Sequence, residues 1–550
     1  MRSSKFLLTG FAASGLAATV TYNWDVTWVS AAPDGFTRPV IGINGQFPCP
    51  PIEATVGDQV VVNLNNQLGN QTTSLHWHGI SQKGTGEMDG PSGVTQCPIP
   101  PGASMTYTFI VDTPGTYWYH SHNHGQYPDG LRGPLIVHDL IDPYAGQYDE
   151  EFILRISDWY HDQVPTLLPQ LLAATNVHAA PPFPDSLLLN DSSTATLAFQ
   201  PNKVYKVRVI SMSAFCATML EFDSHEMNVI EVDGVYVTPY ETSQIRVAAA
   251  QRYSFLLTAK STADQNYAFT ASMDSNRDYS LAATWPTNAT GHIIYDGQKA
   301  LPGSYPVSAW AVFNDQNLSP LDKKALLPAP DNTITMDFNF GFDSLSIPRA
   351  YLNNVSYVGQ KVPTLYSVLT TGSSASDPRV YGQVNPFIVR LGQTVQIVFN
   401  NLDAAIHPLH LHGSWSGSSA DFPSTPMRRD VVEVFGQSHL VIRYTADNPG
   451  VQLFHCHIEW HVEMGFTATI IEAPISIQSL ITVPKQHLSN CQAQGIPTAG
   501  NAAGDRSNYT DLTDANTVPP NPDPGATYTT SSTRRGKRQG PFMGKAFQRA

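Results

Sequence analysis

The residues most able to do chemistry in this chain lie in the segment HCHIEWHVEMGF, at positions 455–466. Cys456 stands between His455 and His457, and His461 follows five residues after the cysteine. Successive side chains of a β-strand point to opposite faces, so His455 and His457 share one face and Cys456 takes the other. A thiolate with two imidazoles is the ligand set of a blue-copper electron-transfer site. The spacing therefore predicts two metal centres that share one strand.

Three further histidine pairs have the same i, i+2 spacing, in LHWHG, YHSH and HPLHLHG. One such pair is weak evidence, because zinc sites and ordinary polar strands also contain it, but four pairs with an embedded cysteine are specific. Eight paired imidazoles can hold three copper ions, and His407, Cys456 and His461 can complete a separate blue-copper site. The paired residues are His76, His78, His120, His122, His410, His412, His455 and His457.

Composition indicates an acidic, turn-rich β protein. The chain has 550 residues, of which 41 % are hydrophobic and 14 % charged, with a formal net charge of -14, 42 prolines and 39 glycines. This length is compatible with about three domains of common size. Residues 20–500 present no basic run, so we expect no nucleic-acid partner.

The N-terminal sequence MRSSKFLLTGFAASGLAATV has a basic start, an apolar run and small residues at Ala17 and Ala18. These features predict a secretory signal peptide at residues 1–18. A buried first strand is the alternative, and Arg2 and Lys5 ahead of the apolar run disfavour it. No later run of about 18 apolar residues occurs, so we expect no membrane span. The mature protein is expected to be secreted, at the cell surface or in the cell wall.

The numbers of cysteines and of glycosylation sequons are consistent with an exported protein. If Cys456 binds copper, four cysteines remain, which allow two disulfides with three possible pairings. Six Asn-x-Ser/Thr sequons predict a glycosylated extracellular protein. The remaining cysteines are Cys49, Cys97, Cys216 and Cys491, and the sequons begin at Asn70, Asn190, Asn288, Asn317, Asn354 and Asn508.

An internal repeat explains why the histidine pairs come from distant parts of the chain. VGDQVVVNLNNQL at 56–68 matches LGQTVQIVFNNLD at 391–403, and each precedes a histidine pair. PGTYWYHSH at 114–122 likewise matches PGVQLFHCH at 449–457. The first and last domains are therefore expected to be duplicates that contribute four histidines each to one cluster.

Between the duplicates, residues 204–211 and 251–259 repeat the strand pattern without histidine pairs, which predicts a ligand-free β domain. We predict an all-β protein whose three domains are separated by Pro-rich and Asp-rich segments. The predicted domains are residues 19–140, 141–330 and 331–491. Residues 492–550 are rich in Gly, Asn, Asp, Pro and Thr, which predicts a disordered tail with a solvated basic end.

The four histidine motifs together resemble those of the multicopper oxidase family and cover the first and last domains. This resemblance implies three cupredoxin-like Greek-key β domains and four copper ions, one of type 1, one of type 2 and two of type 3. It also implies an enzyme that takes single electrons from a reducing substrate and reduces O2 to two waters. We expect a monomer whose partners are O2 and a small reductant.

The resemblance implies a ligand role for each histidine by its position in the motifs. Type 1 ligands would be His407, Cys456 and His461, and type 2 ligands would be His76 and His410. Type 3 ligands would be His78, His120, His122, His412, His455 and His457.

The resemblance also implies roles for nearby residues. The axial position of the type 1 site, ten residues after the cysteine, is Phe466, which cannot coordinate copper and favours a high potential. Met464 lies two residues too early and is assigned to packing. Asp89 and Glu459 match acid positions that supply protons for O2 reduction, with strand-end hydrogen bonding as the alternative role.

The family's bridge between the first domain and the C-terminal segment is matched by Cys97 and Cys491. A second bridge between Cys49 and Cys216 is a weaker prediction. Both would fit the oxidising environment of an exported protein.

The substrate is less evident. HIEWHVEMG, TATIIEAP and LEFDSHEMNVIEVDG resemble the fungal ferroxidase branch, which also contains secreted pigment-forming oxidases. Iron oxidation requires carboxylates beside a type 1 histidine, and Glu221 and Asp223 are the candidates. The alternative interpretation is that these two acids belong to a charged loop at a strand edge and bind no substrate. Only 14 residues separate His412 from Met427. Relatives usually carry a longer acidic loop there.

This short loop would open the rim of the type 1 site to a bulkier phenol. The alternative is that it reflects a mispredicted splice in the gene model, in which case the third domain lacks a strand. The membrane anchor of iron-uptake members is not seen, and Ala217 stands where litter-degrading laccases often have a phenol-binding acid. We therefore predict a secreted laccase-like oxidase of phenols or hydroquinones, with a role in conidial pigment formation suggested by resemblance alone. A ferroxidase that oxidises Fe(II) for iron uptake is the first alternative. A non-catalytic copper-binding protein is the second, and the presence of all eleven ligands disfavours it.

Overall fold

The chain is described by a computed structural model that places residues 17–274, 288–305, 307, 313–413, 416–418 and 423–521. The predicted signal peptide lies outside the described residues except for Ala17 and Ala18. Residues 414, 415 and 419–422 of the short loop between His412 and Met427 and the basic end of the tail also lie outside them.

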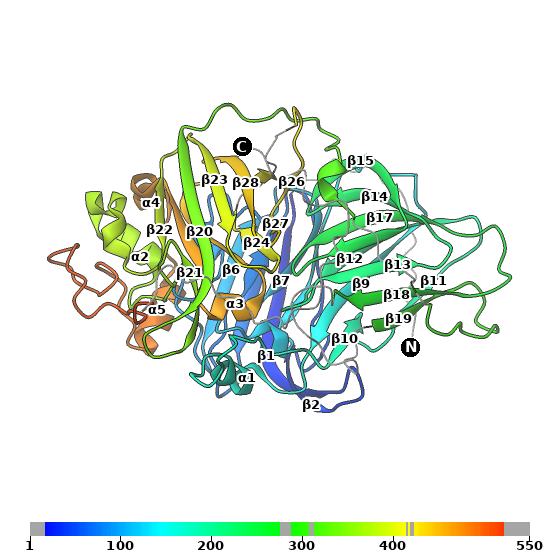
Figure 1. The fold of residues 1–550 in the computed structure, drawn as a ribbon, viewed down its shortest axis with the longest axis horizontal. Helices are drawn as coiled ribbons and strands as arrows, with labels where there is room; N and C mark the ends of the chain where they lie inside the picture. The colour runs from blue at the N-terminus through cyan, green and yellow to red at the C-terminus, as the bar shows by residue number, and fades with distance from the viewer. Residues whose placement is uncertain are drawn as a thin grey trace.

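Alternating apolar and polar residues build the strands. In β4 (Gln59–Asn66) every second side chain is buried, and β23 (Thr394–Asn401) has nearly the same pattern. Such alternation buries one face of a strand in the core and leaves the other nearer to solvent. The described elements form six sheets, which pair into three double-sheet domains along the chain (Figure 1). The all-β prediction is confirmed.

The first domain has sheets of strand order β2-β1-β4-β6 and β3-β8-β7-β5. The remaining strands of this domain are β1 (Thr19–Ala31), β2 (Arg38–Ile43), β3 (Ile52–Thr55), β5 (His76–His78), β6 (Ser104–Ile110), β7 (Gly115–His120) and β8 (Arg132–His138). Short helical turns η1 (Gly86–Met88) and η2 (Tyr127–Asp129) lie between them.

The second domain has sheets of order β10-β9-β12-β17-β14-β15 and β11-β19-β18-β13-β16. Its strands are β9 (Glu150–Trp159), β10 (Ser186–Leu189), β11 (Thr196–Ala198), β12 (Val204–Ser211), β13 (Thr218–Phe222), β14 (Met227–Val232), β15 (Val235–Thr242), β16 (Gln244–Val247), β17 (Arg252–Thr258), β18 (Tyr267–Met273) and β19 (Asn288–Ile294). Helix α1 (Val164–Leu171) follows β9, and η3 (Asp315–Asn317) follows β19.

The third domain has sheets of order β21-β20-β23-β28-β25-β26 and β22-β30-β29-β24-β27. Its other strands are β20 (Asn332–Phe342), β21 (Pro348–Leu352), β22 (Pro386–Val389), β24 (His407–Leu411), β25 (Ser416–Ser418), β26 (Arg428–Arg429), β27 (Val431–Val434), β28 (Ser438–Thr445), β29 (Gly450–Cys456) and β30 (Thr467–Glu472). Its helical segments are α2 (Thr364–Thr370), η4 (Gly372–Ser376), η5 (Pro378–Tyr381), α3 (Glu459–Glu463), α4 (Pro474–Leu480) and α5 (Lys485–Ala493).

The repeated sequences occupy equivalent places in the first and third domains. Strand β4 pairs parallel with β1 and antiparallel with β6, and β23 pairs in the same way with β20 and β28. The histidine-bearing strands β5 and β7 correspond to β24 and β29. The sequence duplication therefore corresponds to a duplication of structure.

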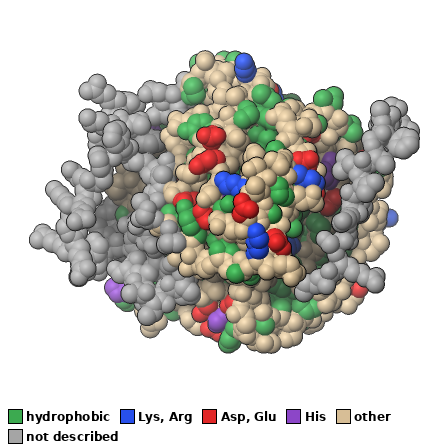
Figure 2. Space-filling view, turned by 90° about the vertical axis from the view of Figure 1, so that its right-hand side faces the viewer, with side chains coloured by type: hydrophobic (Ala, Val, Ile, Leu, Met, Phe, Trp, Pro, Cys, Tyr) green, Lys and Arg blue, Asp and Glu red, His purple; other side chains and the backbone are tan. Residues whose placement is uncertain are grey.

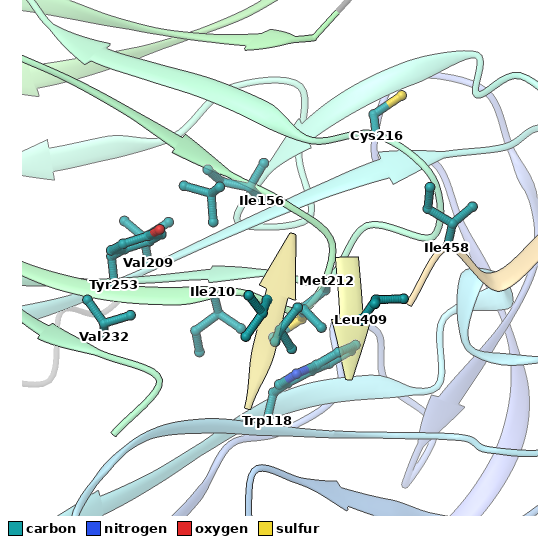
Figure 3. Packing of buried hydrophobic residues seen from close by; sticks show 14 of the residues in the cluster. Trp118, Ile156, Val209, Ile210, Met212, Cys216, Val232, Tyr253, Leu409 and Ile458 are labelled. Atoms are coloured by element: carbon teal, nitrogen blue, oxygen red, sulfur yellow. The ribbon is translucent and has the colours of Figure 1, made fainter. Parts of the chain in front are cut away.

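One continuous apolar cluster joins the domains, and Figure 3 shows part of it. Trp118 of the first domain, Val209 and Tyr253 of the second, and Leu409 and Ile458 of the third all belong to it. Apolar burial contributes roughly 25 cal/mol per Å² removed from water. The strand that carries His407 and His410 is thus held in place by a core that all three domains share.

Part of the segment predicted to be a disordered tail is folded. Residues 492–521 fold against the third domain, and Asn501 and Ala502 are at most 1 % exposed. The backbone N–H of Ala502 donates to the carbonyl of Val380. The side-chain oxygen of Asn501 accepts from the N–H of Asp505 at 2.9 Å, so a buried amide closes a loop that is disordered by composition alone. The prediction is wrong for this segment, and the rest of the tail lies outside the described residues.

Among the described residues, no helix has the length and apolar character needed to cross a membrane. On the face of the molecule drawn in Figure 2, acidic and basic side chains lie interspersed rather than gathered by sign. Five of the six sequon asparagines are exposed and Asn190 is partly buried.

Candidate metal centres

Strand pairing brings the predicted histidine pairs together. In the first domain β5 pairs antiparallel with β7, and His76 lies opposite His120. In the third domain β24 pairs antiparallel with β29, and His410 lies opposite His455. Each domain therefore presents one pair of neighbouring strands that carry histidines on the same face.

The histidines of the two domains meet at the domain interface. The rings of His76 and His412 stack with centroids 4.0 Å apart, and those of His78 and His410 stack at 3.9 Å. The ring of His457 lies 4.9 Å from that of His78. Ring nitrogens within 4.8 Å of one another form the groups His76–His410–His412, His76–His78–His120 and His122–His412–His455. All eight paired histidines thus belong to one cluster.

Several of these rings have one nitrogen bonded outward and the other without a partner. Nδ1 of His76 and of His410 donates to the backbone carbonyls of Asp89 and Asp430, each at 2.9 Å. The Nε2 atoms of His76, His410 and His120 are buried and have no hydrogen-bond partner in the described part of the chain. Buried polar atoms are normally satisfied, and a metal ion satisfies imidazole nitrogens oriented in this way. The residues present therefore fit a copper cluster.

Burial keeps these rings neutral. It lowers the pKa of His455 to about 4, because a charge is unfavourable away from water. The same cause, with repulsion from neighbouring rings, lowers the pKa of His78, His120, His122, His410, His412 and His457. Neutral imidazole is the form that binds metal ions.

Carboxyl groups flank the cluster. Oδ2 of Asp89 accepts from Nδ1 of His412 at 2.8 Å, which fixes the orientation of that ring. Oδ1 of Asp430 lies 3.3 Å from Nε2 of His78. Glu459 lies at the start of α3 and is 8 % exposed, and burial together with a neighbouring carboxyl raises its pKa well above the usual value. Asp430 was not predicted, because it lies between β26 and β27 and has no spacing relation to a histidine motif.

The second domain braces the cluster through one arginine. Arg252 on β17 is 0 % exposed, and its two terminal nitrogens donate to the two carboxylate oxygens of Asp430 at 2.6 Å each. Gly79, which follows His78, has φ +89°, and a Cβ there would lie 2.7 Å from Arg252 Nη2. Only glycine combines this backbone angle with so close an approach. The ion pair between Arg252 and Asp430 therefore requires glycine at position 79, in the motif LHWHG.

The second centre lies on the opposite face of β29. Sγ of Cys456 is 3.8 Å from Nδ1 of His407 and 3.6 Å from Nδ1 of His461, and all three side chains are at most 2 % exposed. The ring of Phe466 is 5.3 Å from that of His407 and stacks on Phe338 at 3.6 Å. The side chain of Phe466 thus places an apolar ring, with no ligand atom, beside the ring of His407. This arrangement suits a three-coordinate blue-copper site.

A carboxylate that the sequence analysis missed contacts this centre. Oδ2 of Asp403 lies 3.2 Å from Nε2 of His407 and also accepts from the backbone N–H of Ala405 at 2.9 Å. That second bond is a short-range turn contact typical of aspartate, and it aims the carboxylate at the histidine four residues later. Burial raises the pKa of Asp403, but the hydrogen bonds outweigh this and the pKa is lowered overall. The spacing of Asp403 and His407 was the available signal.

A small cavity of about 60 Å³ lies beside His461. Its walls are largely apolar, and its charged groups come from three different segments. The apolar side chains are Phe183, Phe215, Ala217, Ala248, Ala249, Ala405, Ile406, Pro408 and Ile458, with Cys216 among them. The charged side chains are Arg246, Asp274 and Glu433.

The predicted substrate acids do not line this cavity. Glu221 accepts from Tyr305 at 2.8 Å and from Gln244, and Asp223 accepts from Ser224 at 2.8 Å. Strand β13 begins at Thr218, directly after the cavity residue Ala217, and a strand advances about 3.3 Å per residue, so Glu221 lies roughly 13 Å beyond Ala217. Glu221 and Asp223 thus lie away from this cavity, and the carboxylates that line it among the described residues are those of Asp274 and Glu433.

Cys97 and Cys491 form the predicted disulfide, with an S–S distance of 2.11 Å and Cα atoms 5.3 Å apart. Cys49 and Cys216 are both buried free thiols, so the proposed second bridge is not formed. Cys49 lies against the carbonyl of Gly130, whereas Cys216 lines the cavity beside His461. The two residues belong to different parts of the fold.

Family comparisons agree with this architecture. Models described as multicopper oxidase match residues 25–141, 150–298 and 357–476. The chain belongs to the multicopper oxidase family. It has three cupredoxin domains, its cofactor is copper, and its histidine clusters are consistent with copper sites of types 1, 2 and 3.

The relatives favour one branch of the family. The chain is 49 % identical over 534 residues to the "iron transport multicopper oxidase fetC" of Epichloe festucae, covering 94 % of this chain and 86 % of the relative. It is 38 % identical to the corresponding FET3 protein of Saccharomyces cerevisiae, covering 91 % and 83 %.

Solved structures also favour the iron-transport branch. The crystal structure of Fet3p, described as a multicopper oxidase that functions in iron import, superposes with a TM-score of 0.88 at 37 % identity, covering 91 % of this chain and 99 % of that one. The laccase of Botrytis aclada gives 0.75 at 28 % identity, covering 88 % and 93 %. The chain is thus more similar to an iron-import oxidase than to this laccase.

Proposed function

We propose that this protein is a ferroxidase that oxidises Fe(II) at its electron-entry site and reduces O2 at the histidine cluster. The proposal replaces the laccase-like reading as the favoured one, because the iron-transport relatives match nearly the whole chain. Four ferrous ions lose one electron each, and one O2 takes up four electrons and four protons to give two waters.

The proposed ligand roles follow from the positions of these residues in the family's motifs, and the clustering of the same residues at two centres supports them. The electron-entry site comprises His407, Cys456 and His461. The cluster comprises His76 and His410 as type 2 ligands and His78, His120, His122, His412, His455 and His457 as type 3 ligands. When bound, copper supplies one-electron acceptance at the first site and four-electron reduction of O2 at the second. Cys456 is bonded through the backbone to His455 and His457, so ligands of the two sites are neighbours in sequence.

The observation that carries the proposal is the contact between Asp403 and His407. A ferrous ion requires oxygen ligands, and a carboxylate stabilises the ferric product more than the ferrous substrate because of its greater charge. Asp403 is both a carboxylate and a hydrogen-bond partner of a type 1 ligand. It therefore offers a short route from a bound iron ion to the electron-entry site.

The cavity beside His461 supports the same conclusion by its size. Sites that enclose drug-sized organic ligands usually have volumes of 300–1,000 Å³. A cavity of about 60 Å³ does not accommodate a phenol ring, but it accommodates an ion with one or two waters. Oxidation of a phenol or hydroquinone at the outer edge of this cavity is the second candidate function, and its apolar walls favour it.

Two acids are proposed to supply protons to the cluster. Asp89 is hydrogen-bonded to His412, and Glu459 is buried two residues from His457 and from His461. A positioned acid within hydrogen-bond reach of the reacting group is what proton transfer requires. We also propose that the protein is exported and glycosylated, which its sequons and disulfide support.

Steady-state O2 consumption with Fe(II) and with a hydroquinone distinguishes the two candidates. We expect the wild type to have the higher kcat/KM for Fe(II), and Asp403→Asn to lower that value by about tenfold or more, since one charge-assisted contact is lost. The hydroquinone kcat/KM should change by less than about twofold. A wild type that oxidises only the hydroquinone refutes the ferroxidase proposal.

A further inference from the structure

Among the described residues, the charged wall of the cavity beside His461 contains two carboxylates and one guanidinium. Arg246 on β16 donates through Nε to Oδ2 of Asp274 at 2.9 Å and through Nη1 to Oε1 of Glu433 on β27. The three side chains are only 10–16 % exposed. One guanidinium therefore occupies the place between two carboxylates that line the same cavity as a type 1 ligand.

The arginine remains charged in this position. Burial lowers the pKa of Arg246, but the attraction of Glu433 and Asp274 outweighs this and raises it overall. Arg246 therefore keeps its positive charge at all working pH values. Together with the carboxylates of Asp274 and Glu433, it gives the three side chains a net charge of -1. A divalent cation entering the cavity must compete with Arg246 for the same oxygens.

We propose that Arg246 is an internal competitor of the metal substrate and the residue that sets the affinity of the electron-entry cavity for Fe(II). This inference rests on the proposed ferroxidase function. In the resting enzyme the guanidinium occupies the cation position, and an incoming ferrous ion displaces it from Asp274 and Glu433. Once the iron has given up one electron beside His461, return of the guanidinium to the carboxylates competes with the ferric ion and promotes its release.

The physical reason is that two facing carboxylates without a cation bind a divalent ion well and a trivalent ion better. Without the arginine, substrate would bind tightly, but the ferric product would dissociate slowly. With the arginine, both bind more weakly, and turnover is faster at high iron concentration. Neutral reductants do not compete with the guanidinium, so their oxidation should not depend on it.

The test uses the copper-loaded full-length enzyme and the variant Arg246→Gln. Removing the positive charge should lower KM for Fe(II) by about tenfold or more and lower kcat, because one unit charge a few ångströms away is lost at low effective dielectric. KM for an uncharged hydroquinone should change by less than about twofold. Arg428→Gln is the matched control, since Arg428 pairs with Asp322 outside this cavity, and it should leave KM for Fe(II) unchanged.

Binding of Mn(II), followed by electron paramagnetic resonance, gives a readout that does not depend on turnover. Mn(II) prefers oxygen ligands and is the weakest competitor for copper sites among the first-row divalent ions. Arg246→Gln should bind one Mn(II) about tenfold more tightly than the wild type, and Arg246→Lys, which keeps the charge, should stay close to the wild type. Unchanged Mn(II) affinity and unchanged KM for Fe(II) in Arg246→Gln overturn the proposal.

A second variant covers the case in which Arg246→Gln does not fold. Glu433→Gln removes one carboxylate and should weaken Mn(II) binding and raise KM for Fe(II), and an unchanged value of both contradicts the proposal. Retention of the blue absorption shows that the type 1 site is intact in each variant. If Arg246→Gln binds Mn(II) more tightly but neither it nor the wild type oxidises iron, competition between Arg246 and a divalent cation is supported and the proposed ferroxidase function fails.

Discussion

Replacing Arg252 by methionine tests how the second domain holds the histidine cluster. Arg252 is fully buried and binds both oxygens of Asp430, which in turn contacts His78. Removing one partner of a buried ion pair leaves an uncompensated charge and typically costs about 3–5 kcal/mol. Arg252→Met should therefore lower the free energy of unfolding by that amount and weaken copper retention in the cluster.

The matched control is Lys83→Met, which breaks the pair between Lys83 and Asp447. Those side chains are 54 % and 63 % exposed, so the loss should be below about 1 kcal/mol. Denaturant titrations of both variants, followed by tryptophan fluorescence, give the difference. Burial raises the pKa of Asp430, so the loss in Arg252→Met should be largest above neutral pH and shrink as the carboxyl is protonated in acid. Equal losses in the two variants would refute the reasoning.

Two further predictions concern single side chains. Cys456→Ser should abolish the blue absorption and turnover of every reductant while leaving copper in the histidine cluster, as copper analysis and absorption spectroscopy can check; retained oxidation contradicts the assignment. Burial raises the pKa of Glu472 from its usual 4.5 to about 7. The protonated carboxyl therefore contributes to the free energy of unfolding in full below pH 4.5, and this contribution is lost as the pH rises through 7. Glu472→Gln should therefore gain about 3 kcal/mol relative to the wild type at pH 8 and nothing from this source at pH 4, by denaturant titration. Equal relative stability at the two pH values would show that Glu472 is not held protonated.

Much of the metal chemistry could be predicted from the sequence because it depends on short spacing. Alternation along a strand decides that His455 and His457 face one way and Cys456 the other, whatever surrounds the strand. The repeat of 56–68 at 391–403 indicated that a matching domain supplies the other half of the cluster, and the pairing of the repeated strands confirms it.

Other features were beyond reach because they depend on contacts between distant segments. Asp430 lies near the cluster only because β27 pairs with β24 and Arg252 crosses from the second domain. Glu221 and Asp223 lie away from the cavity beside His461 because β13 runs away from it, and a sequence pattern does not give that direction. The fold of residues 492–521 was missed because one buried asparagine, Asn501, compensates for a composition that otherwise predicts disorder.

The sequence by itself determined the candidate metal ligands, the two faces of the shared strand and the duplication that doubles the histidines, since all three follow from motifs that the sequence shows directly. Only the tertiary structure decided which charges surround the electron-entry site. Asp403 is local and was recognisable in principle, whereas Arg246, Asp274 and Glu433 come from separate strands and segments that meet only when the second and third domains pack together. Electrostatic interactions depend on distance in space rather than in sequence. For that reason the reaction class could be read from the motifs, while the proposed control of substrate affinity became visible only in the folded protein.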